Sequence, residues 1–459
     1  MTIWRPSIEK GSTPLYLAIA NAVQDDLESG VLAVGARLPT HRDLAEYLGV
    51  TVGTVSRAYA ESERRGLTSG EVGRGTFVRG AEVEEHGWAA APASEARSVI
   101  DLSLATPWTM PGEGDLLAKT LKQIAEEGKA DNLLRYDPET ASFSQRAAAA
   151  AWITRLGMPA KPEQIVVTTG AQHAMTVLFS TLLRPGDTVL TGDLTYPGMK
   201  GIAQMLGLRL RGVALDDEGL RPDSLEEACR ESSPKAIYCV PTIQNPTGAL
   251  MSQERRQEVA RVAQAHDLLI IEDDVHAFLL DNPPAPLSLA APERSIYLST
   301  ISKSVTFGLR TGFIVAPDRM VERIRAGVRS TIWMPSPLTT ELTARWLTDG
   351  TADHIARIKR DEVRARNAIV REVLGSRYDV QGHPAALHSW LRLPEPFRSD
   401  ECVGQAKQRG VLVAGAEAFA VGRKEVPHAV RVCIGSVLRR DDLRRGLEIL
   451  GEVLEGCCD

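Results

Sequence analysis

Short apolar segments of β-type composition alternate with helical segments through most of this 459-residue chain. The apolar segments are residues 164–169, 188–191, 236–240, 268–271, 295–299 and 312–315. Alternation of this kind predicts a mainly parallel sheet that is covered by helices. We therefore expect a large α/β domain over residues 101–354. A smaller α+β lobe with its own helices and short strands is expected over residues 355–459.

The length and the charge of the chain limit its organisation. A chain of 459 residues exceeds one ordinary hydrophobic core, so two or three domains are expected. The formal net charge of −6 argues against non-specific binding to nucleic acid or to acidic membranes. The six cysteines form no zinc-type Cys-x-x-Cys pair, and no apolar run approaches the roughly 20 residues that cross a bilayer. We expect a soluble, cytoplasmic protein that has no metal site and no membrane partner.

Residues 1–80 have the pattern of a small DNA-binding domain. The expected elements are a helix over 15–27, a helix over 41–48, a turn at 49–50, a third helix over 51–65 and a hairpin over 67–78. Two short helices that are joined by a tight turn form a helix-turn-helix, and the glycine-rich hairpin fits a wing. Residues 81–100 are rich in Ala and Glu without clean periodicity, which predicts a linker.

The candidate DNA contacts lie at the start of the third helix and at the tip of the wing. Small hydroxyl residues and an arginine occupy the helical turn that would enter a major groove. Residues 37–79 contain seven basic and five acidic residues, and the basic excess falls on the segments that are expected to meet phosphates. The candidate residues are Thr40, Arg42, Thr51, Thr54, Ser56, Arg57, Arg74 and Gly75. The alternative is a small helical cap with ordinary solvated arginines.

Three sequence blocks in this region resemble a known family of DNA-binding proteins. The blocks are Gly35-Ala-Arg-Leu-Pro-Thr-His-Arg42-Asp-Leu-Ala45, Thr54-Val-Ser-Arg-Ala-Tyr59 and Gly73-Arg-Gly-Thr-Phe-Val78. They are similar to the winged helix-turn-helix of GntR-family regulators. The resemblance implies that residues 1–80 form an α+β domain that binds double-stranded operator DNA.

An ordered set of residues in the large domain suits pyridoxal phosphate. The amine of Lys303 can form a Schiff base with the cofactor aldehyde, and Arg310 can hold the phosphate. Asp273 ends an apolar strand, where a protonated pyridine nitrogen would give the buried carboxylate a partner. The alternatives are a solvated lysine and an aspartate that caps the following helix.

Further residues at strand ends could surround the same cofactor. Ala171 and Gln172 open a helix directly after Gly170, where free amides could bind a phosphate. Tyr196 follows the next strand and could stack on a pyridine ring, although this position taken alone favours a loop tyrosine that packs on the surface. Asn245, in Asn-Pro-Thr-Gly, can direct its amide at the phenolic oxygen of the cofactor.

Taken in order, these motifs resemble the fold-type-I, aspartate-aminotransferase-like enzymes over roughly residues 100–455. The resemblance implies pyridoxal 5'-phosphate as the cofactor, with Lys303 and Asp273 as the catalytic pair. It implies that the cofactor is bound by Ala171, Gln172, Tyr196, Asn245, Asp273, His276, Thr300, Ser302, Lys303 and Arg310, with Tyr136 reaching the phosphate of a neighbouring subunit. It also implies that Arg431 binds a substrate carboxylate, although a surface strand residue is the alternative.

Two positions depart from the pattern of that family. A tyrosine usually follows the ring aspartate by two or three residues, where this chain has Val275 and His276. Histidine can still donate a hydrogen bond, and its charge can change near neutral pH. Residues 139–141 replace a glycine that is usual a few residues after Tyr136.

A GntR-like domain that is joined to an aminotransferase-like domain resembles the MocR subgroup of bacterial regulators, which dimerise. We expect a transcription regulator that carries pyridoxal phosphate on Lys303 and senses an amine or amino-acid effector. As a homodimer it would present two DNA-binding heads to paired half-sites. A working aminotransferase with a vestigial head and a sensor of the cofactor itself are the alternatives. The effector, the operator sequence and the direction of regulation stay open at this point.

Overall fold

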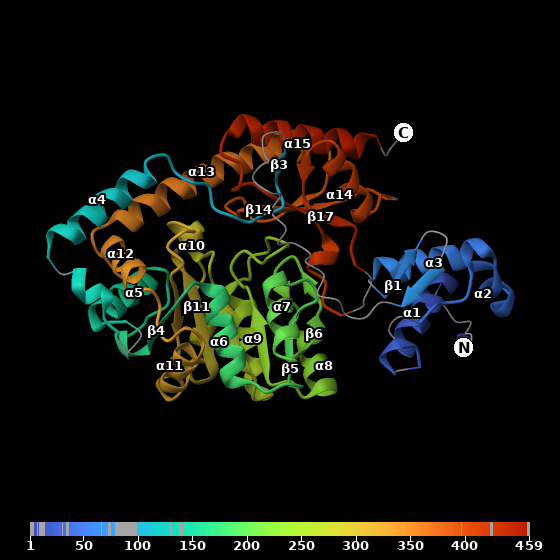
Figure 1. The fold of residues 1–459 in the computed structure, drawn as a ribbon, viewed down its shortest axis with the longest axis horizontal. Coiled ribbons are helices and arrows are strands. Elements are labelled where there is room, and N and C mark those ends of the chain that lie inside the picture. The colour runs from blue at the N-terminus through green and yellow to red at the C-terminus, as the bar shows by residue number, and fades with distance from the viewer. Residues whose placement is uncertain are drawn as a thin grey trace. The chain divides into compact units, whose positions relative to one another are not determined.

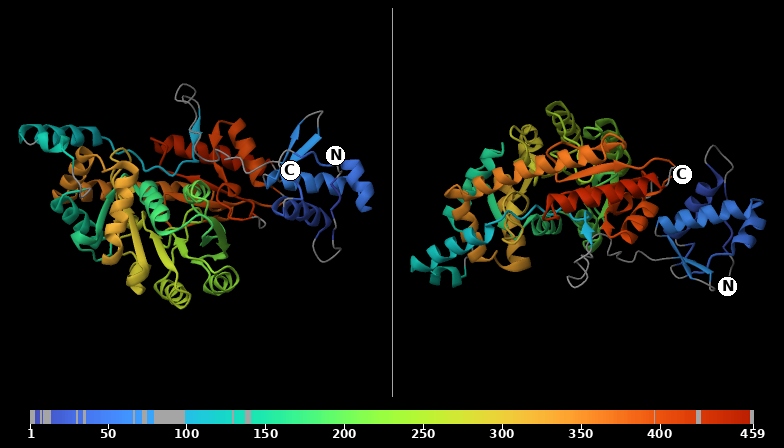
Figure 2. Two further views of the ribbon diagram at one scale, coloured as in Figure 1. Left: turned by 60° about the horizontal axis from the view of Figure 1, so that its bottom comes forward. Right: turned by 90° about the horizontal axis from the view of Figure 1, so that it is seen from above.

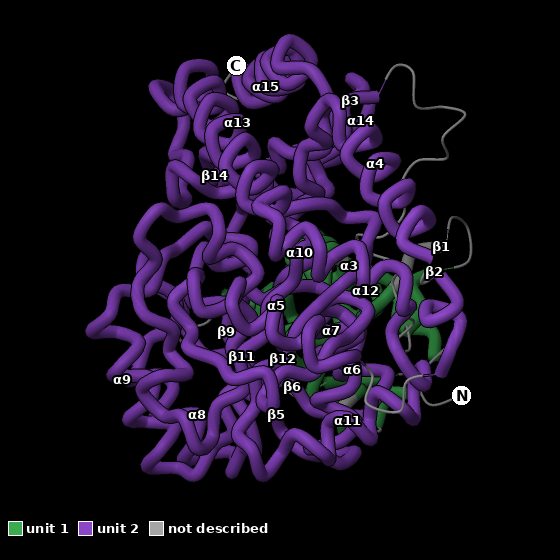
Figure 3. Tube along the Cα trace, turned by 90° about the vertical axis from the view of Figure 1, so that its left-hand side faces the viewer, with its two compact units in different colours: residues 1–86 green, residues 87–459 purple. Residues whose placement is uncertain are grey.

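A computed structural model of the protein (Figure 1, Figure 2) divides the chain into two compact units, Met1–His86 and Gly87–Asp459 (Figure 3). The structure describes residues 4–6, 8, 14–29, 31–33, 36–65, 67–71, 75–78, 99–128, 130–136, 141–395, 397–422 and 426–456. The expected linker, residues 81–100, lies outside the described residues except for its last two positions. Among the described helices, none combines the length and the apolar composition that a membrane span requires.

Unit 1 has the elements that the sequence predicts. Its described elements are helices α1 (Leu15–Glu28), α2 (His41–Leu48) and α3 (Val52–Arg64) and the antiparallel strands β1 (Thr68–Glu71) and β2 (Gly75–Val78). Apolar residues at helical spacing give each helix one inward face. Ile19, Val23, Leu44, Val55 and Ala58 are buried between the helices. The three helices and the hairpin therefore enclose one small core.

A short segment before α2 extends the wing, which the sequence did not predict. The backbone N–H of Leu38 donates to the carbonyl of Thr76 at 2.9 Å, and that of Val78 donates to the carbonyl of Ala36 at 2.8 Å. The Tyr59 hydroxyl also donates to the carbonyl of Pro39 at 2.8 Å, which ties this segment to α3. The wing and the helix-turn-helix are thus joined through residues 36–39.

A mainly parallel sheet forms the centre of unit 2, as the sequence predicts. Its strands, in spatial order, are β4 (Ile165–Thr168), β12 (Gly312–Val315), β11 (Ser295–Thr300), β10 (Leu269–Asp273), β9 (Ala236–Cys239), β5 (Thr188–Gly192) and β6 (Arg209–Val213). Within these described strands, β12 runs antiparallel to both of its neighbours, and the other pairs are parallel. Strand β6 was not among the predicted strands, because Arg209, Arg211 and Gly212 interrupt its apolar pattern.

Helices cover both faces of this sheet (Figure 1). Alternate strand residues enter different cores, since successive side chains of a strand point to opposite faces. One core contains Val189 and Ile271 with side chains of α6 (Ala171–Leu182), α7 (Pro197–Met205) and α11 (Asp318–Ile332). The other contains Leu190 and Ile270 with side chains of α8 (Pro222–Ser232) and α9 (Gln253–Ala265). The sheet is therefore buried on both sides, and its carboxyl edge is left to carry polar residues.

The C-terminal part of unit 2 contains a second, antiparallel sheet. Its strands are β13 (Val380–Gln381), β14 (His388–Arg392), β17 (Ala429–Cys433) and β16 (Ala414–Gly415). Helices α13 (Thr351–Val373), α14 (Ser399–Gln408) and α15 (Arg440–Glu455) complete this lobe, in which α13 and α15 lie side by side (Figure 2). Helix α13 passes through residue 354 without interruption, so the subdivision of unit 2 at this point stays a proposal.

Four further α-helices are described in unit 2. They are α4 (Glu113–Glu126), α5 (Phe143–Arg155), α10 (Ile301–Ser304) and α12 (Pro337–Thr348). Strand β3 (Ile100–Asp101) pairs in parallel with β15 (Val411–Leu412). The first described residues of unit 2 are therefore built into the C-terminal lobe.

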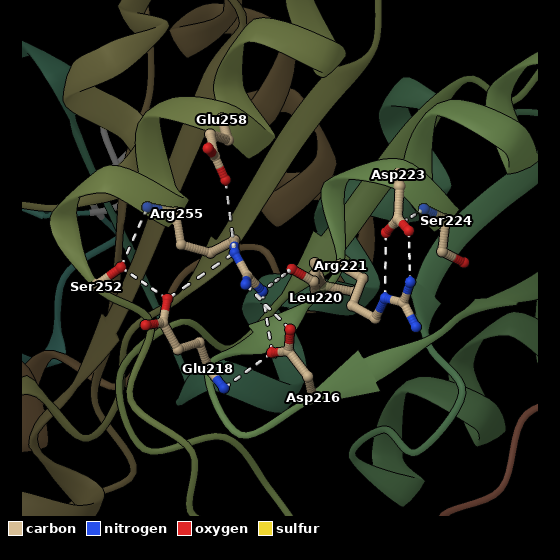
Figure 4. Close-up of polar contacts among 9 residues, drawn as sticks. All are labelled: Asp216, Glu218, Leu220, Arg221, Asp223, Ser224, Ser252, Arg255 and Glu258. Atoms are coloured by element: carbon tan, nitrogen blue, oxygen red, sulfur yellow. Dashed lines mark hydrogen bonds and ion pairs between the residues drawn. The ribbon is translucent and has the colours of Figure 1, made fainter.

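A polar cluster fixes the start of α9 to the hairpin of β7 (Leu215–Asp216) and β8 (Gly219–Leu220) (Figure 4). Arg255 donates to the two carboxylate oxygens of Asp216 at 3.0 Å each and to the carbonyl of Leu220 at 3.0 Å. Ser252 donates to Glu218 at 2.8 Å. Because α9 directly follows the loop that carries Asn245, this cluster anchors one end of that loop.

Arg255→Ala tests this anchor. The variant loses a bidentate ion pair whose arginine side chain is only 17% exposed. We therefore expect the free energy of unfolding to fall by about 1–2 kcal/mol. The measurement is the thermal unfolding midpoint of the full chain. Arg261→Ala is the control on the same helix, since its side chain is 72% exposed and lies 3.9 Å from Glu258. Equal midpoints for the two variants would contradict the anchoring role.

Candidate cofactor site and DNA-binding surface

A cavity of about 310 Å³ lies at the carboxyl edge of the central sheet. Parallel strands end together at this edge, where α/β proteins bind their ligands. The predicted residues that line the cavity are Ala171, Gln172, Tyr196, Asn245, Asp273, His276, Thr300, Ser302, Lys303, Arg310 and Arg431. The fold thus brings together side chains that are far apart in the sequence.

The buried carboxyl group of Asp273 has one satisfied and one unsatisfied oxygen. Its Oδ2 accepts a hydrogen bond of 2.7 Å from the Tyr238 hydroxyl, and its Oδ1 has no partner among the described residues. Burial raises the pKa of Asp273 to about 6, against the opposing effects of Tyr238 and of the Lys303 charge. A protonated pyridine nitrogen would supply the missing N–H and the missing positive charge. Asp273 therefore fits the ring nitrogen of pyridoxal phosphate.

Lys303 is placed in the cavity by the short helix α10, which follows β11 directly. Thr300 caps this helix by accepting a 3.1 Å hydrogen bond from the backbone N–H of Ser302. The Lys303 amine donates to the carbonyl of Ala105. Burial, together with nearby Arg431 and Arg310, lowers the pKa of Lys303 to about 8. A larger fraction of the amine is therefore neutral and nucleophilic at neutral pH than for an exposed lysine.

A site for an anion lies where α6 begins. The backbone of Gly170 has a positive φ of 89°, and a Cβ there would lie 2.8 Å from the Arg310 guanidinium. Arg310 also donates to the Ser302 hydroxyl at 3.4 Å. The first N–H groups of a helix have no partner within the helix, and a helix N-terminus favours negative charge. Gly170, Ser302 and Arg310 thus fit a phosphate group.

Arg431 lines the cavity from strand β17 of the antiparallel sheet. Its guanidinium donates to Asn245 Oδ1 at 2.7 Å and to the carbonyl of Ser103 at 2.6 Å, and lies 4.6 Å from the centre of the Phe419 ring. Its Nε has no partner among the described residues. The residue is 7% exposed, so the alternative of a surface strand residue is wrong. Its position fits the carboxylate of a ligand.

His276 lies where the related enzymes usually have a tyrosine. Its Nδ1 is 3.1 Å from the carbonyl of Ile243, and its Nε2 has no partner among the described residues. Burial, and after it the charge of Lys303, lowers the pKa of His276 to about 3. The expectation that its charge changes near neutral pH is therefore wrong, because a buried ring beside cationic groups stays neutral.

Tyr136 is the predicted cofactor residue that does not line the cavity. Its side chain is 51% exposed and packs edge-to-face against Trp333, with 5.5 Å between the ring centres. A role toward the phosphate of a neighbouring subunit requires such exposure. That role stays a prediction.

The structure adds residues in and behind the cavity that the sequence did not reveal, and Tyr238 lies behind the cavity rather than in its lining. Tyr238 lies inside an apolar strand and shows no sign of its contact with Asp273. Residues 104–106 line the cavity but precede every motif that was recognised in the large domain. Phe307 lies 4.6 Å from Arg310 and 6.0 Å from the Lys303 amine. Its place between two predicted site residues was the one available signal.

The predicted DNA-binding residues of unit 1 lie at the exposed starts of α2 and α3. The Thr51 hydroxyl caps α3 by accepting from the backbone N–H of Thr54 at 3.2 Å, and the Thr40 hydroxyl caps α2. The exposed predicted residues are Thr40, Arg42, Thr51, Ser56 and Arg57, and Thr54 is half-buried. The two caps therefore fix the ends of both helices and leave α3 free to face a groove.

The wing is described only in part. Arg74 lies outside the described residues. Gly75 has a positive φ of 120°, and a Cβ there would lie 2.8 Å from Nε of Arg37. Arg37 is exposed and was absent from the predicted DNA contacts. Its pairing with the wing, which the sequence did not reveal, explains the omission.

Comparison with known proteins identifies the families of both domains. Residues 97–450 match the family described as aminotransferase class I and II, and residues 15–78 match the bacterial regulatory proteins of the gntR family. The uncharacterized HTH-type transcriptional regulator YdeF of Bacillus subtilis is 31% identical over 457 residues, which cover 98% of this chain and 97% of YdeF. The HTH-type pyridoxine biosynthesis transcriptional regulator PdxR of Corynebacterium glutamicum is 29% identical over 401 residues, or 84% of each chain.

A solved structure supports the fold of unit 2. Kynurenine aminotransferase from Pyrococcus horikoshii, in complex with PMP and its substrates and products, aligns with a TM-score of 0.73 at 25% identity. The alignment covers 80% of this chain and 93% of that enzyme. With one domain of each kind in a single polypeptide, the chain belongs to the GntR-family transcriptional regulators that carry a class I and II aminotransferase domain.

Proposed function

We propose that the protein is a DNA-binding transcription regulator whose aminotransferase-like unit carries pyridoxal phosphate and senses an amino acid or another amine. The observation that carries this proposal is the cavity in which the unpaired Oδ1 of Asp273 and the buried amine of Lys303 face one ligand site. The helix-turn-helix in the same chain links that cavity to operator DNA. The family and the cofactor of the aminotransferase-like unit agree with this function.

Different residues of the cavity would bind the cofactor and the effector. Bound pyridoxal phosphate supplies an electrophilic carbon that can bond to an amine. Asp273 holds the ring nitrogen, and Ser302 with Arg310 holds the phosphate. Arg431 would bind the carboxylate of an effector, which favours an amino acid over a plain amine. An effector amine that displaces Lys303 would change the contacts around α10 and shift the balance between conformations of the regulator.

The exposed aromatic residues of unit 2 support a homodimer. Tyr136, Trp333 and Phe143 are large side chains with at least half of their surface accessible. Tyr136 and Trp333 pack edge-to-face and so form one exposed aromatic cluster, and contiguous exposed apolar surface marks interaction sites. A second copy that covers them would bring Tyr136 toward the cavity of the partner, and would place two DNA-binding heads in one assembly. We place the assembly in the cytoplasm, where operator DNA is found.

An active aminotransferase is the second candidate function. The cavity holds the complete set of a base, a ring-nitrogen partner and a carboxylate-binding arginine in Lys303, Asp273 and Arg431. A released Lys303 amine could carry a proton to or from the substrate. Steady turnover of an amino acid with an oxo-acid, without binding to operator DNA, would favour this alternative.

Lys303→Ala tests the cofactor assignment. Borohydride reduction of the native holoprotein, followed by peptide mass spectrometry, is expected to find a pyridoxyl group on Lys303 and none in the variant, because Lys303 is the one lysine among the described residues that lines the cavity. Phosphate contacts remain in the variant, so non-covalent cofactor binding is expected to persist. A pyridoxyl group on a different lysine would remove the assignment.

The low pKa of Lys303 predicts how fast cofactor-free protein takes up pyridoxal phosphate. Only the neutral amine attacks an aldehyde, so the rate of covalent uptake is expected to rise with pH and to level off above about pH 8. The control is free lysine with its α-amino group blocked, so that only the side-chain amine can react. Its reaction rate should keep rising with pH up to its ordinary pKa of about 10.4. Identical pH profiles for the two amines would contradict the burial effect.

Arg57→Ala tests the DNA-binding surface. Genomic fragments that the native protein selects serve as the operator probe. We expect weaker binding, with a smaller dependence on salt if the lost contact is to a phosphate. Arg261→Ala, which removes an exposed charge from unit 2, should bind like the native protein. Equal affinity of Arg57→Ala and the native protein would argue against a groove contact at this position.

A further inference from the structure

The ring of His276 has a fixed direction of hydrogen bonding. A carbonyl oxygen only accepts, so the 3.1 Å contact with Ile243 requires the proton to be on Nδ1 of the histidine. The neutral ring then carries a lone pair, and no proton, on Nε2. This Nε2 is buried and has no partner among the described residues, and His276 lines the cavity. The residue therefore presents an acceptor to the ligand, where a tyrosine would present a donor.

Asn245 presents the opposite group. The Arg431 guanidinium only donates, so the 2.7 Å contact requires the amide oxygen of Asn245 to face Arg431. The amide NH₂ is then the group that remains for a ligand. Asn245 and His276 are held together, because the ring of His276 bonds the backbone two residues before Asn245. The same wall of the cavity thus offers one donor and one acceptor.

The chemistry of the cofactor places its phenolic oxygen beside these two residues. In pyridoxal phosphate the ring nitrogen lies opposite the aldehyde carbon, and the phenolic oxygen and the phosphate arm lie on opposite sides of that axis. Asp273 and Lys303 fix the axis, and Arg310 with Gly170 fixes the phosphate side. Asn245 and His276 both line the cavity and are joined through the Ile243 carbonyl, and each has one group left for a ligand, so we assign this pair to the other side. This step rests on the proposed binding of pyridoxal phosphate.

We propose that His276 accepts a hydrogen bond from the phenolic hydroxyl of bound pyridoxal phosphate, while Asn245 donates to the same oxygen, so that the cofactor keeps a neutral phenol. A hydroxyl can donate one hydrogen bond and accept another, which matches this pair of groups. A phenolate can only accept, and its charge would face the lone pair on Nε2. His276 is thus a specificity-determining residue for the protonation state of the cofactor.

The surroundings of His276 keep it from switching to a donor. A second proton on the ring would create a charge that is buried beside Lys303 and Arg431, which explains why its pKa is lowered. The ring of His388 lies 6.0 Å away, and its Nε2 is 3.1 Å from the carbonyl of Gln244. The two histidines therefore hydrogen-bond to the consecutive carbonyls of Ile243 and Gln244, in the loop that carries Asn245. Rotation of either ring would break a buried hydrogen bond.

Absorbance of the holoprotein at neutral pH tests this inference. The neutral phenol form absorbs in the near ultraviolet and the phenolate form in the visible, and the near-ultraviolet band is expected to dominate the native spectrum. His276→Tyr adds a donor in place of the acceptor. We expect the ratio of the near-ultraviolet band to the visible band to fall about tenfold or more. His354→Gln, on the exposed face of α13, is the control and should keep the native ratio.

Each outcome has one meaning when the cofactor content is measured in the same samples. Borohydride trapping on Lys303 establishes equal loading and excludes an amine form of the cofactor, which is not trapped. A native spectrum that the visible band dominates, or an equal ratio in His276→Tyr at equal loading, would overturn the inference and leave the proposed function intact. The native spectrum decides the question even if His276→Tyr does not fold.

Discussion

The buried carboxyl group of Asp273 is the constraint on which the site in unit 2 depends. A carboxylate inside a protein needs partners for both oxygens, and here the Tyr238 hydroxyl satisfies only one of them. Burial also raises the pKa of this group. A cationic ring nitrogen would give the second oxygen a partner and would favour the charged carboxylate. The lysine, the anion site and the arginine of β17 are arranged around it.

The parallel sheet explains how these groups meet. Asp273, Thr300 and Asn245 lie at or just after the carboxyl ends of neighbouring strands, so register alone brings them to one edge. Arg431 reaches the same cavity from the second sheet. A ligand held between Arg431 and Lys303 therefore contacts both sheets of unit 2. This geometry suits a sensor, because a ligand in the cavity would affect both sheets at once.

Much of the fold and of the site could be predicted from the sequence. The apolar strands gave a clear pattern, and polar residues at their ends were recognisable because buried polar groups need a function or a partner. Strand β6 was missed because arginines interrupt its apolar pattern. The pairing of residues 36–38 with the wing was missed because three residues are too few to show a hydrophobic periodicity. The contact of Tyr238 with Asp273 and the orientation of the His276 ring depend on tertiary packing, which a linear pattern does not contain.

In the proposed function, occupation of the cavity by an amine controls DNA binding by the helix-turn-helix. The most direct test is the affinity of the holoprotein for a selected genomic fragment, measured by fluorescence anisotropy across a panel of amino acids and amines. We expect that at least one compound changes the Kd of the native protein and that Lys303→Ala gives no such response to it. A Kd that stays the same with every compound that alters the cofactor absorbance would rule out control of DNA binding by the cavity.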